Sequence, residues 1–346
     1  MKTWNIGVVG AGLIADFHAR AINDIDNARL IGFCDSGSGH ARELADKYSC
    51  RAFADYQEMV DADDIDILAI ATPSGFHAEP TIAAAQAHKH VICEKPLEVT
   101  LDRIDAMIAA HDNAGTQLGG IFPYRFNDAM VPLRKAIDSG RFGVITYAGV
   151  YVPWWRTDEY YKDSWHGTWK LDGGGALMNQ SIHMIDLLCH LMCPVESVQA
   201  YAHNLGHPQI EAEDTAVVSL RFASGAVGII YGTTASWPGQ FRRFEITGTK
   251  GAVVYLEDSF TVWRFAEETA EDDQIRARFG DISGGGGVAD PAAIDYENHT
   301  RNFKAFIDSL ETGEEFSING QQARKAVELI VAIYESAREQ KCVKLS

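Results

Sequence analysis

A glycine signature close to the N-terminus constrains the fold of this chain more than any other feature. An apolar run leads directly into the segment Gly-Ala-Gly-Leu-Ile-Ala at 10–15, and a helical pattern follows at once. Gly10 permits a tight turn, and Gly12 lets the backbone approach a pyrophosphate with no side chain in between. Leu13 and Ile14 are the first residues of the helix, and their end of it offers unpaired N–H groups and a partial positive charge. This strand–turn–helix unit predicts a dinucleotide-binding site.

An acidic residue ends the second apolar run and bears on the choice of cofactor. Asp35 follows residues 29–34, and an acid at this distance after a glycine turn can accept hydrogen bonds from the adenosine ribose. A plain glycine turn in an α/β core is the alternative, but it does not account for the acid. A carboxylate repels a 2′-phosphate, and Ser36 rather than a basic residue comes next. We therefore expect NAD, with NADP as the alternative because Arg42 follows within a short helical segment.

Charge and composition disfavour several classes of partner. The 346 residues include 30 Lys and Arg against 48 Asp and Glu, giving a net charge of −18. This charge disfavours nucleic acid and anionic membranes, although a locally basic pocket can still accept an anionic substrate. The six cysteines are scattered and form neither a disulfide framework nor a zinc motif, so we expect no metal site. No signal peptide or membrane-length apolar run is apparent, which favours the cytoplasm.

The first third of the chain alternates strand-like and helical patterns. Strand-like runs cover 5–10, 29–35, 65–71, 90–94 and 117–121, and helical patterns cover 13–25, 39–48, 78–87 and 101–113. This alternation predicts a Rossmann-type, doubly wound parallel sheet of the α/β class. The carboxyl ends of parallel strands lie along one edge, where ligands bind. Thr72 with Pro73, and Glu94 with Lys95, follow such ends.

After about residue 123 the pattern changes, as expected for a second domain in a chain of this length. A helix over 129–139, a strand over 144–151 and a glycine-led helix over 173–191 come first. β-rich runs follow at 198–203, 215–222, 226–233, 241–248, 252–256 and 260–265, and helices over 299–310 and 320–338 close the chain. These runs predict a large, mostly antiparallel open sheet. Residues 267–291, acidic and then glycine-rich, are expected to form a mobile surface loop that can act as a lid.

Lys95 is the first candidate for chemistry. It lies between Glu94 and Pro96 at a strand end, beside the expected nicotinamide. An ammonium group there can hold a substrate hydroxyl, stabilise a developing alkoxide or relay a proton. The alternative is a surface lysine at the start of a loop. The following proline indicates a fixed bond, for which cis is an option.

Asn179 and His183 are the second candidates. They are four residues apart, so they share a face if the segment is α-helical. Histidine titrates near neutral pH and can take a hydroxyl proton as hydride leaves the same carbon, whereas Asn179 can orient that hydroxyl. Three glycines, at 173–175, are expected to let the helix start approach cofactor or sugar closely. The alternative is that His183 is a satisfied core histidine.

The segment 154–169 is dense in aromatic rings and donors. Sugars present apolar C–H faces and hydroxyl rims, which flat rings with polar tips suit. Packing in the core or in a subunit interface is the alternative for about half of these rings. The substrate-binding candidates are Tyr124, Trp154, Arg156, Tyr161, Trp165 and His166. Arg125 either contacts cofactor or substrate, or pairs with a carboxylate.

Together these residues resemble the Gfo/Idh/MocA family of sugar dehydrogenases, which includes glucose–fructose oxidoreductase and inositol dehydrogenase. The resemblance covers essentially the whole chain. It rests on the glycine turn, on Thr72-Pro73 with His77, on Glu94-Lys95-Pro96, on Tyr124-Arg125-Phe126, on the segment 173–186 and on the closing helix.

The resemblance implies an NAD(P)-binding Rossmann domain over 1–123 and a substrate-binding and oligomerisation domain over 124–346. The open sheet of the second domain is then the interface of a homodimer or tetramer. It also implies NAD(P)-linked oxidation, or the reverse, of a hydroxyl on a sugar, sugar derivative or cyclitol. Lys95 matches the family lysine and His183 its usual acid/base, and Asn179 stands where many members carry aspartate.

The resemblance also completes the expected sites. The cofactor set is Gly10, Gly12, Leu13, Ile14, Asp35, Ser36, Thr72, Pro73, His77, Glu94, Lys95 and Arg125, and Lys95, Asn179 and His183 join the substrate set. Two alternative functions stay open. One is an NAD-dependent glycosidase that oxidises its sugar transiently, and the other is a nucleotide-binding regulatory protein on a dehydrogenase scaffold.

Overall fold

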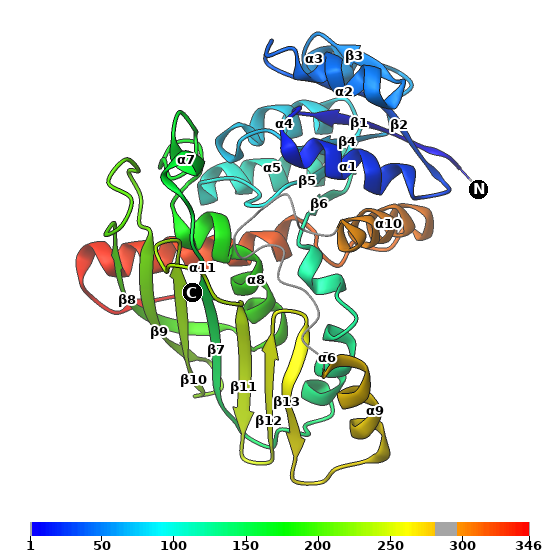
Figure 1. Ribbon diagram of the computed structural model, residues 1–346. Helices are drawn as coiled ribbons and strands as arrows, with labels where there is room; N and C mark the ends of the chain where they lie inside the picture. The colour runs from blue at the N-terminus through cyan, green and yellow to red at the C-terminus, as the bar shows by residue number, and fades with distance from the viewer. Residues whose placement is uncertain (1, 281–295, 346) are drawn as a thin grey trace. The chain divides into compact units, whose positions relative to one another are not determined.

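The computed structural model describes residues 2–280 and 296–345, which form two compact units (Figure 1). The described residues of unit 1 are 2–123, 170–173 and 296–327, and those of unit 2 are 124–169, 174–280 and 328–345. Unit 1 therefore adds two distant segments to the stretch that alternates strand and helix. The strand and helix pattern does not reveal such additions, because it carries no information on long-range packing.

Unit 1 is built on a six-stranded parallel sheet in the order β3-β2-β1-β4-β5-β6. Its strands are β1 (Trp4–Val9), β2 (Ala28–Cys34), β3 (Arg51–Phe53), β4 (Ile67–Ile70), β5 (His90–Cys93) and β6 (Leu118–Gly120). The strand order reverses between β1 and β4, which is the topological switch point where such sheets bind ligands. The predicted doubly wound parallel sheet is confirmed.

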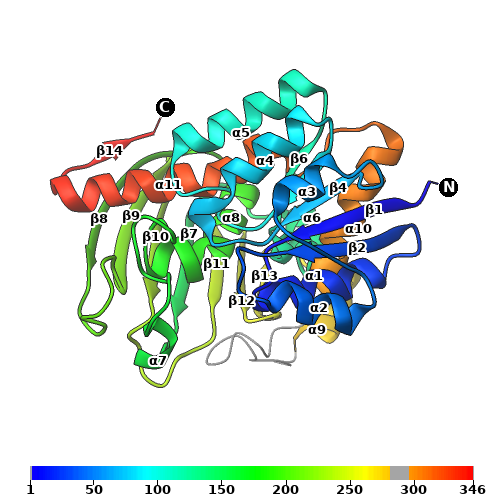
Figure 2. The same ribbon diagram turned by 90° about the horizontal axis from the view of Figure 1, so that it is seen from above.

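The helices of unit 1 cover both faces of this sheet. They are α1 (Leu13–Asn23), α2 (His40–Tyr48), α3 (Tyr56–Asp61), the 3-10 turn η1 (Ser74–Phe76), α4 (Ala78–Gln86), α5 (Leu101–Ala114) and α10 (Glu297–Thr312). Helix α1 packs beside α10, whereas α3, α4 and α5 pack side by side. Figure 2 shows α1 and α2 on the opposite side of the strands from α3, α4 and α5. Strand β3 and helix α3 escaped the sequence prediction because both are very short.

Unit 2 carries an eight-stranded sheet in the order β13-β12-β11-β7-β10-β9-β8-β14. Its strands are β7 (Ile145–Pro153), β8 (Val195–His203), β9 (Thr215–Phe222), β10 (Val227–Thr233), β11 (Arg243–Gly248), β12 (Gly251–Leu256), β13 (Ser259–Phe265) and β14 (Val343–Lys344). Only the β7–β10 pair among these neighbours is parallel. The predicted mostly antiparallel sheet is therefore confirmed.

The helices of unit 2 lie mainly against one face of this sheet. They are the 3-10 turn η2 (Pro123–Phe126), α6 (Met130–Asp138), α7 (Asp158–Tyr161), the π-helix η3 (Ala176–Ser181), α8 (Ile182–Leu191) and α9 (Ala270–Phe279), while α11 (Gly320–Glu339) is shared between the units. Helix α8 packs on β7, and η3 packs on β9 and β10. The described helices include none that is long and apolar enough to cross a membrane.

Two local predictions are wrong. Part of the expected loop over 267–291 is helix α9, and residues 281–291, with the glycine run, lie outside the described residues. Thr269 and Asp272 form a capping box at the start of α9, a signal that the acidic composition obscured. The expected helix over 173–191 is α-helical only from Ile182, because a π-helix precedes it.

Candidate active site

The two glycines of the N-terminal turn serve different purposes. Gly10 has a φ of 110°, and a Cβ atom there would lie 2.4 Å from the carbonyl oxygen of Ala71, so the fold itself requires glycine. Gly12 is the N-cap of α1, and a Cβ there would meet nothing within 4 Å. Beside it, Leu13 is 59% exposed although it is large and apolar. Open space, free helix amides and an exposed apolar side chain fit the pyrophosphate region of a dinucleotide.

Asp35 follows β2 and is held by its own loop. Its carboxylate accepts hydrogen bonds from the Gly37 amide at 2.7 Å, the Ala41 amide at 2.9 Å and the Ser38 hydroxyl at 2.6 Å. Partial burial alone would raise the pKa of Asp35, but these hydrogen bonds lower it to about 2. The side chain is therefore an anion at neutral pH with acceptor capacity remaining, which suits ribose hydroxyls and repels a 2′-phosphate. The neighbouring Ser36 is exposed.

His77 braces two loops at the carboxyl edge of the sheet. Its ring is fully buried, with Nε2 at 2.9 Å from the Thr72 carbonyl oxygen and Nδ1 at 3.0 Å from that of Pro96. Burial lowers the pKa of His77, and the neutral ring that this favours donates its one N–H to one of the two carbonyl oxygens while the other nitrogen lies beside the second. His77 thus fixes the loop of Thr72 and Pro73 against the loop that follows Lys95. These contacts favour a structural role over direct cofactor binding.

Lys95 is half-buried at the end of β5, and its backbone is anchored by its neighbour. The Lys95–Pro96 bond is cis. The amide of Lys95 donates to Glu94 Oε2 at 3.1 Å, and Glu94 Oε1 lies 2.9 Å from Nε2 of His18 on α1. Burial alone would raise the pKa of Glu94, but the hydrogen bond and charge of His18 lower it to about 2. Glu94, expected to bind cofactor, is thus engaged inside unit 1.

In unit 2, η2 is tied to α8 by an ion pair. Arg125 binds Asp186 through two hydrogen bonds of 2.6 and 2.8 Å, and both side chains are almost completely buried. This pairing favours the carboxylate alternative for Arg125 over cofactor binding. The neighbouring Tyr124 ring has its centroid 5.0 Å from that of His183, and the Arg242 guanidinium lies 4.3 Å from the Tyr124 ring. Sequence reasoning missed Arg242, which no local motif marks.

Asn179 and His183 lie on consecutive helical segments of different type. Asn179 belongs to η3 and His183 to the first turn of α8, and both are half-buried. The expected α-helical spacing therefore does not describe how Asn179 and His183 are placed relative to each other. π-helical turns are rare and occur frequently at functional sites. The junction of η3 and α8 thus adds structural support for a functional role of this segment.

The three glycines before η3 make room for protein groups. A Cβ atom would lie 2.8 Å from Val99 Cβ at Gly173, 2.1 Å from the Tyr334 hydroxyl at Gly174, and only 1.7 Å from the Glu213 carbonyl oxygen at Gly175. We expected these glycines to let a cofactor or sugar approach. The atoms closest to them instead belong to the protein itself, so they allow close internal packing.

The aromatic segment divides into core and partly exposed rings. Trp154 and Tyr161 are buried, and the Tyr161 hydroxyl donates to Thr234 Oγ1 at 2.8 Å, so these two rings pack in unit 2. Trp165 stacks on His166 with ring centroids 4.1 Å apart, and both are half-buried. The buried Arg156 guanidinium lies 5.0 Å from the Trp154 ring, and burial lowers its pKa. Trp165 and His166 retain surface for a ligand.

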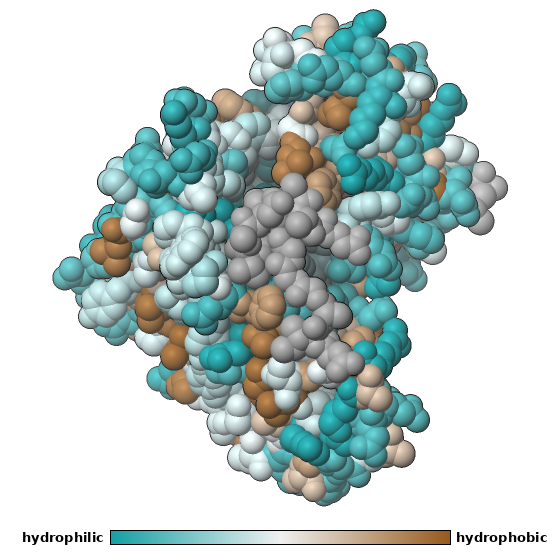
Figure 3. Space-filling model, in the orientation of Figure 1, coloured by the Kyte–Doolittle hydropathy of each residue, from teal (hydrophilic) through white to brown (hydrophobic). Residues whose placement is uncertain are grey.

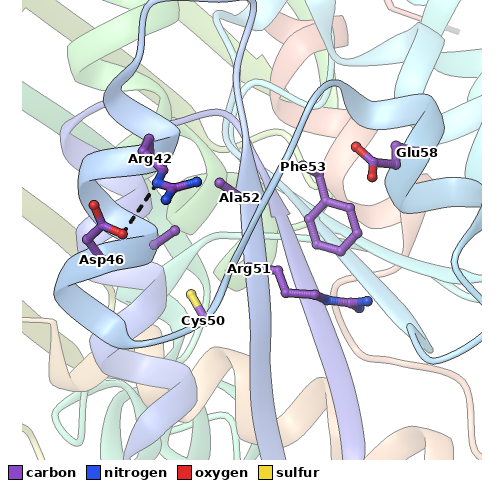
Figure 4. A pocket seen from close by; sticks show the side chains of 8 residues that line it. Arg42, Asp46, Cys50, Arg51, Ala52, Phe53 and Glu58 are labelled. Atoms are coloured by element: carbon purple, nitrogen blue, oxygen red, sulfur yellow. Dashed lines mark ion pairs between the residues drawn. The ribbon is translucent and has the colours of Figure 1, made fainter.

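A pocket of about 290 Å³ opens beside α2 and β3, and none of the predicted site residues lines it (Figure 4). Arg42 lines it and pairs with Asp46 at 3.4 Å, so its guanidinium is directed along its own helix. Within the described residues, no group of three or more His, Cys, Asp or Glu side chains could hold a metal ion.

Comparison with known proteins gives the family. Residues 4–121 match the model of the oxidoreductase family with an NAD-binding Rossmann fold, and residues 130–254 match the GFO/IDH/MocA C-terminal domain. This chain belongs to the Gfo/Idh/MocA oxidoreductase family. The predicted family, enzyme class and cofactor NAD are thereby confirmed.

Relatives of this Gfo/Idh/MocA oxidoreductase include structures with bound cofactor. The WlbA dehydrogenase from Bordetella pertussis, solved with NADH and UDP-GlcNAcA, is 34% identical with a TM-score of 0.91, covering 100% of this chain and 98% of that chain. Myo-inositol 2-dehydrogenase from Thermotoga maritima is 29% identical over 98% of both chains. The 2,7-anhydro-N-acetylneuraminate hydratase of Escherichia coli is 31% identical over 72% of this chain and 66% of its own length.

Proposed function

We propose that this oxidoreductase transfers a hydride between NAD and a hydroxyl-bearing carbon of a sugar, sugar derivative or cyclitol. The observation that carries the proposal is the anchored lysine at the end of β5. Lys95 follows a buried strand next to the switch point of the sheet, and Glu94 fixes its backbone. A cation on a rigid support there can stabilise negative charge as it develops on a substrate oxygen. The named dehydrogenase relatives support the substrate class.

The residues of unit 1 would hold the cofactor. Gly12 leaves space for the pyrophosphate at the start of α1, and the anionic Asp35 offers acceptors to the ribose. Thr72 and Pro73, braced by His77, lie at the neighbouring strand end. The nicotinamide of a bound NAD would supply the hydride acceptor in oxidation and the hydride donor in the reverse reaction.

The remaining steps belong to protein side chains. His183 takes the proton of the reacting hydroxyl, and Lys95 and Asn179 hold its oxygen. In the reverse direction His183 returns that proton to the alkoxide. General-base help of this kind contributes roughly 10²–10⁴ in rate.

A substrate screen with one variant tests the proposal. Free sugars, nucleotide sugars, glycosides, sugar acids and cyclitols are each incubated with enzyme and NAD, and NADH formation is measured. His183→Ala should lower kcat by roughly 10²–10⁴ and leave the Kd for NAD, measured by calorimetry, nearly unchanged. Near-wild-type turnover of that variant would remove His183 from the mechanism, and NAD binding without oxidation of any compound class would refute the dehydrogenase activity.

A second candidate is a reaction without net redox change, in which the sugar is oxidised transiently, a group is eliminated or added, and the hydride returns. The hydratase relative favours it, since one similar protein is named for addition of water. Product analysis separates the two candidates. The second predicts release of an aglycone or a hydrated product while no NADH accumulates.

We also propose that the enzyme is a homo-oligomer, a dimer or tetramer, assembled through the open face of the eight-stranded sheet. Tyr201, Val217 and Val227 on that face are 65%, 48% and 55% exposed. Figure 3 shows apolar residues gathered in patches over the strands of unit 2. Exposed apolar patches of this kind are typical of interaction surfaces.

A further inference from the structure

Glu213, just before β9, holds the start of the segment that carries Asn179 and His183. Its side chain is 4% exposed. Oε1 accepts hydrogen bonds from the Leu177 amide at 2.8 Å and from the Tyr334 hydroxyl at 3.0 Å. Oε2 accepts one from the Gly175 amide at 3.1 Å, and the Glu213 carbonyl oxygen accepts one from the Ala176 amide at 3.0 Å. A single residue therefore binds three successive amides at the first turn of η3.

Two glycines of the run, Gly174 and Gly175, allow this contact. The hypothetical Cβ of Gly174 would overlap the Tyr334 hydroxyl, and that of Gly175 would overlap the Glu213 carbonyl. Any larger residue at either position would push η3 away from Glu213 and Tyr334. Glycine at these two positions therefore lets the start of η3 lie against the Tyr334 hydroxyl and the Glu213 backbone.

We propose that Glu213 is a positioning residue for the Asn179 and His183 side chains, acting by fixing the first turn of η3. The inference rests on the proposed roles of those two residues. The first amides of a helix have no partner within the helix, and an anion at that end stabilises them. The π-helical turn η3 is of a rare type, and Glu213 supplies partners for the amides that begin it.

The charge of Glu213 determines how firmly the turn is held. Burial raises the pKa of Glu213 to about 7, although the hydrogen bonds from Leu177, Tyr334 and Gly175 oppose the rise. The ionised carboxylate accepts all three hydrogen bonds, whereas protonation of one oxygen weakens its ability to accept. The titratable group that contacts it from α11 is Tyr334, and the adjacent Asp214 is turned toward the amides at 205–207.

Glu213→Gln tests the proposal because glutamine keeps an acceptor but cannot ionise. We expect kcat to fall roughly 10-fold or more, as misplacement of a catalytic group does, while the Kd for NAD changes by less than about twofold. The acidic limb of the kcat–pH profile should lose the contribution of Glu213 and retain that of His183. Asp272→Asn is the matched control, because Asp272 is a fully buried carboxylate of the same unit that caps α9. It should lower the melting temperature without changing kcat or the profile.

Tyr334→Phe is the second variant and removes one hydroxyl while leaving the fold intact. Without that hydrogen bond the pKa of Glu213 should rise, so the acidic limb should move to higher pH. A Glu213→Gln enzyme with wild-type kcat and an unchanged profile would overturn the proposal. Should the glutamine variant fail to fold, an unshifted limb in Tyr334→Phe would overturn it instead.

An NMR arm separates this proposal from the proposed function. The carboxyl signal of Glu213 is assigned by its loss in Glu213→Gln and titrated together with the imidazole signals of His183. The His183 signals should shift at the midpoint of Glu213 and lose that transition in the variant. This readout needs no turnover, so it decides on Glu213 even if no sugar is oxidised. His183 signals insensitive to Glu213 would refute the positioning role.

Discussion

At the scale of single residues, buried carboxylates hold the candidate site in place. Glu94 holds the Lys95 amide and contacts His18, and Glu213 holds the start of η3. Glu94 lies at the edge of the sheet and Glu213 contacts the segment beside the glycine run, and both are places where a ligand could bind. Both carboxylates are nevertheless buried and bonded to protein groups. Their charges matter because they are almost completely removed from water.

The Glu94 charge predicts a specific dependence of stability on pH. Its folded pKa of about 2 is below the ordinary value of 4.5, so its stabilising contribution is present above pH 4.5 and is lost as pH falls toward 2. A shift of this size corresponds to about 3 kcal/mol, of which about 2 kcal/mol should disappear between pH 6 and pH 3. The measurement is the free energy of unfolding in urea for wild type and Glu94→Gln at both values. A difference between the two proteins that is independent of pH would contradict it.

The sequence can nominate candidate residues, but it does not reveal their partners. Glycine, lysine and histidine at strand ends or beside a glycine run mark possible chemistry, and Lys95 and His183 are candidates on that ground. Arg125, however, pairs with Asp186 at a separation of 61 residues, and Glu94 contacts His18 at a separation of 76. Only the folded chain brings such pairs together, so the sequence could not distinguish a ligand contact from an internal one.

At the scale of elements, the sequence predicted the strand–turn–helix unit at the N-terminus but not the η3–α8 junction. The first follows from local rules, since β1, the glycine turn and α1 are adjacent and each has a strong signature. The second depends on Glu213 and Tyr334, which are distant in sequence, and its π-helical form has no pattern in the hydrophobic periodicity. The short β3 and α3 were missed because their periodicity covers too few residues.

The two glycines of the first turn give a paired prediction at this scale. Gly12→Ala should leave the melting temperature nearly unchanged, because its Cβ meets no atom and its φ of −80° suits any residue. The Kd for NAD should rise roughly 10-fold or more, because the methyl group occupies the space assigned to the pyrophosphate.

Gly10→Ala is the contrasting variant. It should destabilise the protein even without NAD, because its φ of 110° and its overlap with Ala71 strain the backbone. Thermal unfolding without NAD and calorimetric titration with NAD measure both effects. Equal NAD affinity of wild type and Gly12→Ala would place the pyrophosphate elsewhere.

At the scale of the whole molecule, the alternation of exposed and buried residues in β9 indicates that, among the described residues, one face of this strand is exposed. We expect charge on that face to dissociate the proposed oligomer, because it prevents apolar burial. Val217→Arg combined with Val227→Glu should lower the mass measured by light scattering to that of one chain, about 38 kDa. Val217→Thr, which keeps the size of the side chain and adds no charge, is the matched control and should leave the mass unchanged. A wild-type mass of one chain would refute the oligomer itself.

Unit 1 is built from segments that are distant in the sequence, and this affects the order in which the chain can fold during synthesis. Helix α10 packs against α1, and Asn302 Oδ1 accepts a hydrogen bond from the Phe122 amide at 3.0 Å, yet α10 follows residues 124–169 and 174–280 of unit 2 in the chain. A ribosome therefore delivers the entire parallel sheet long before the helix that covers α1. During synthesis, the surface of α1 that α10 covers therefore stays exposed until residues 297–312 have been translated. Unit 1 can be completed only after that point.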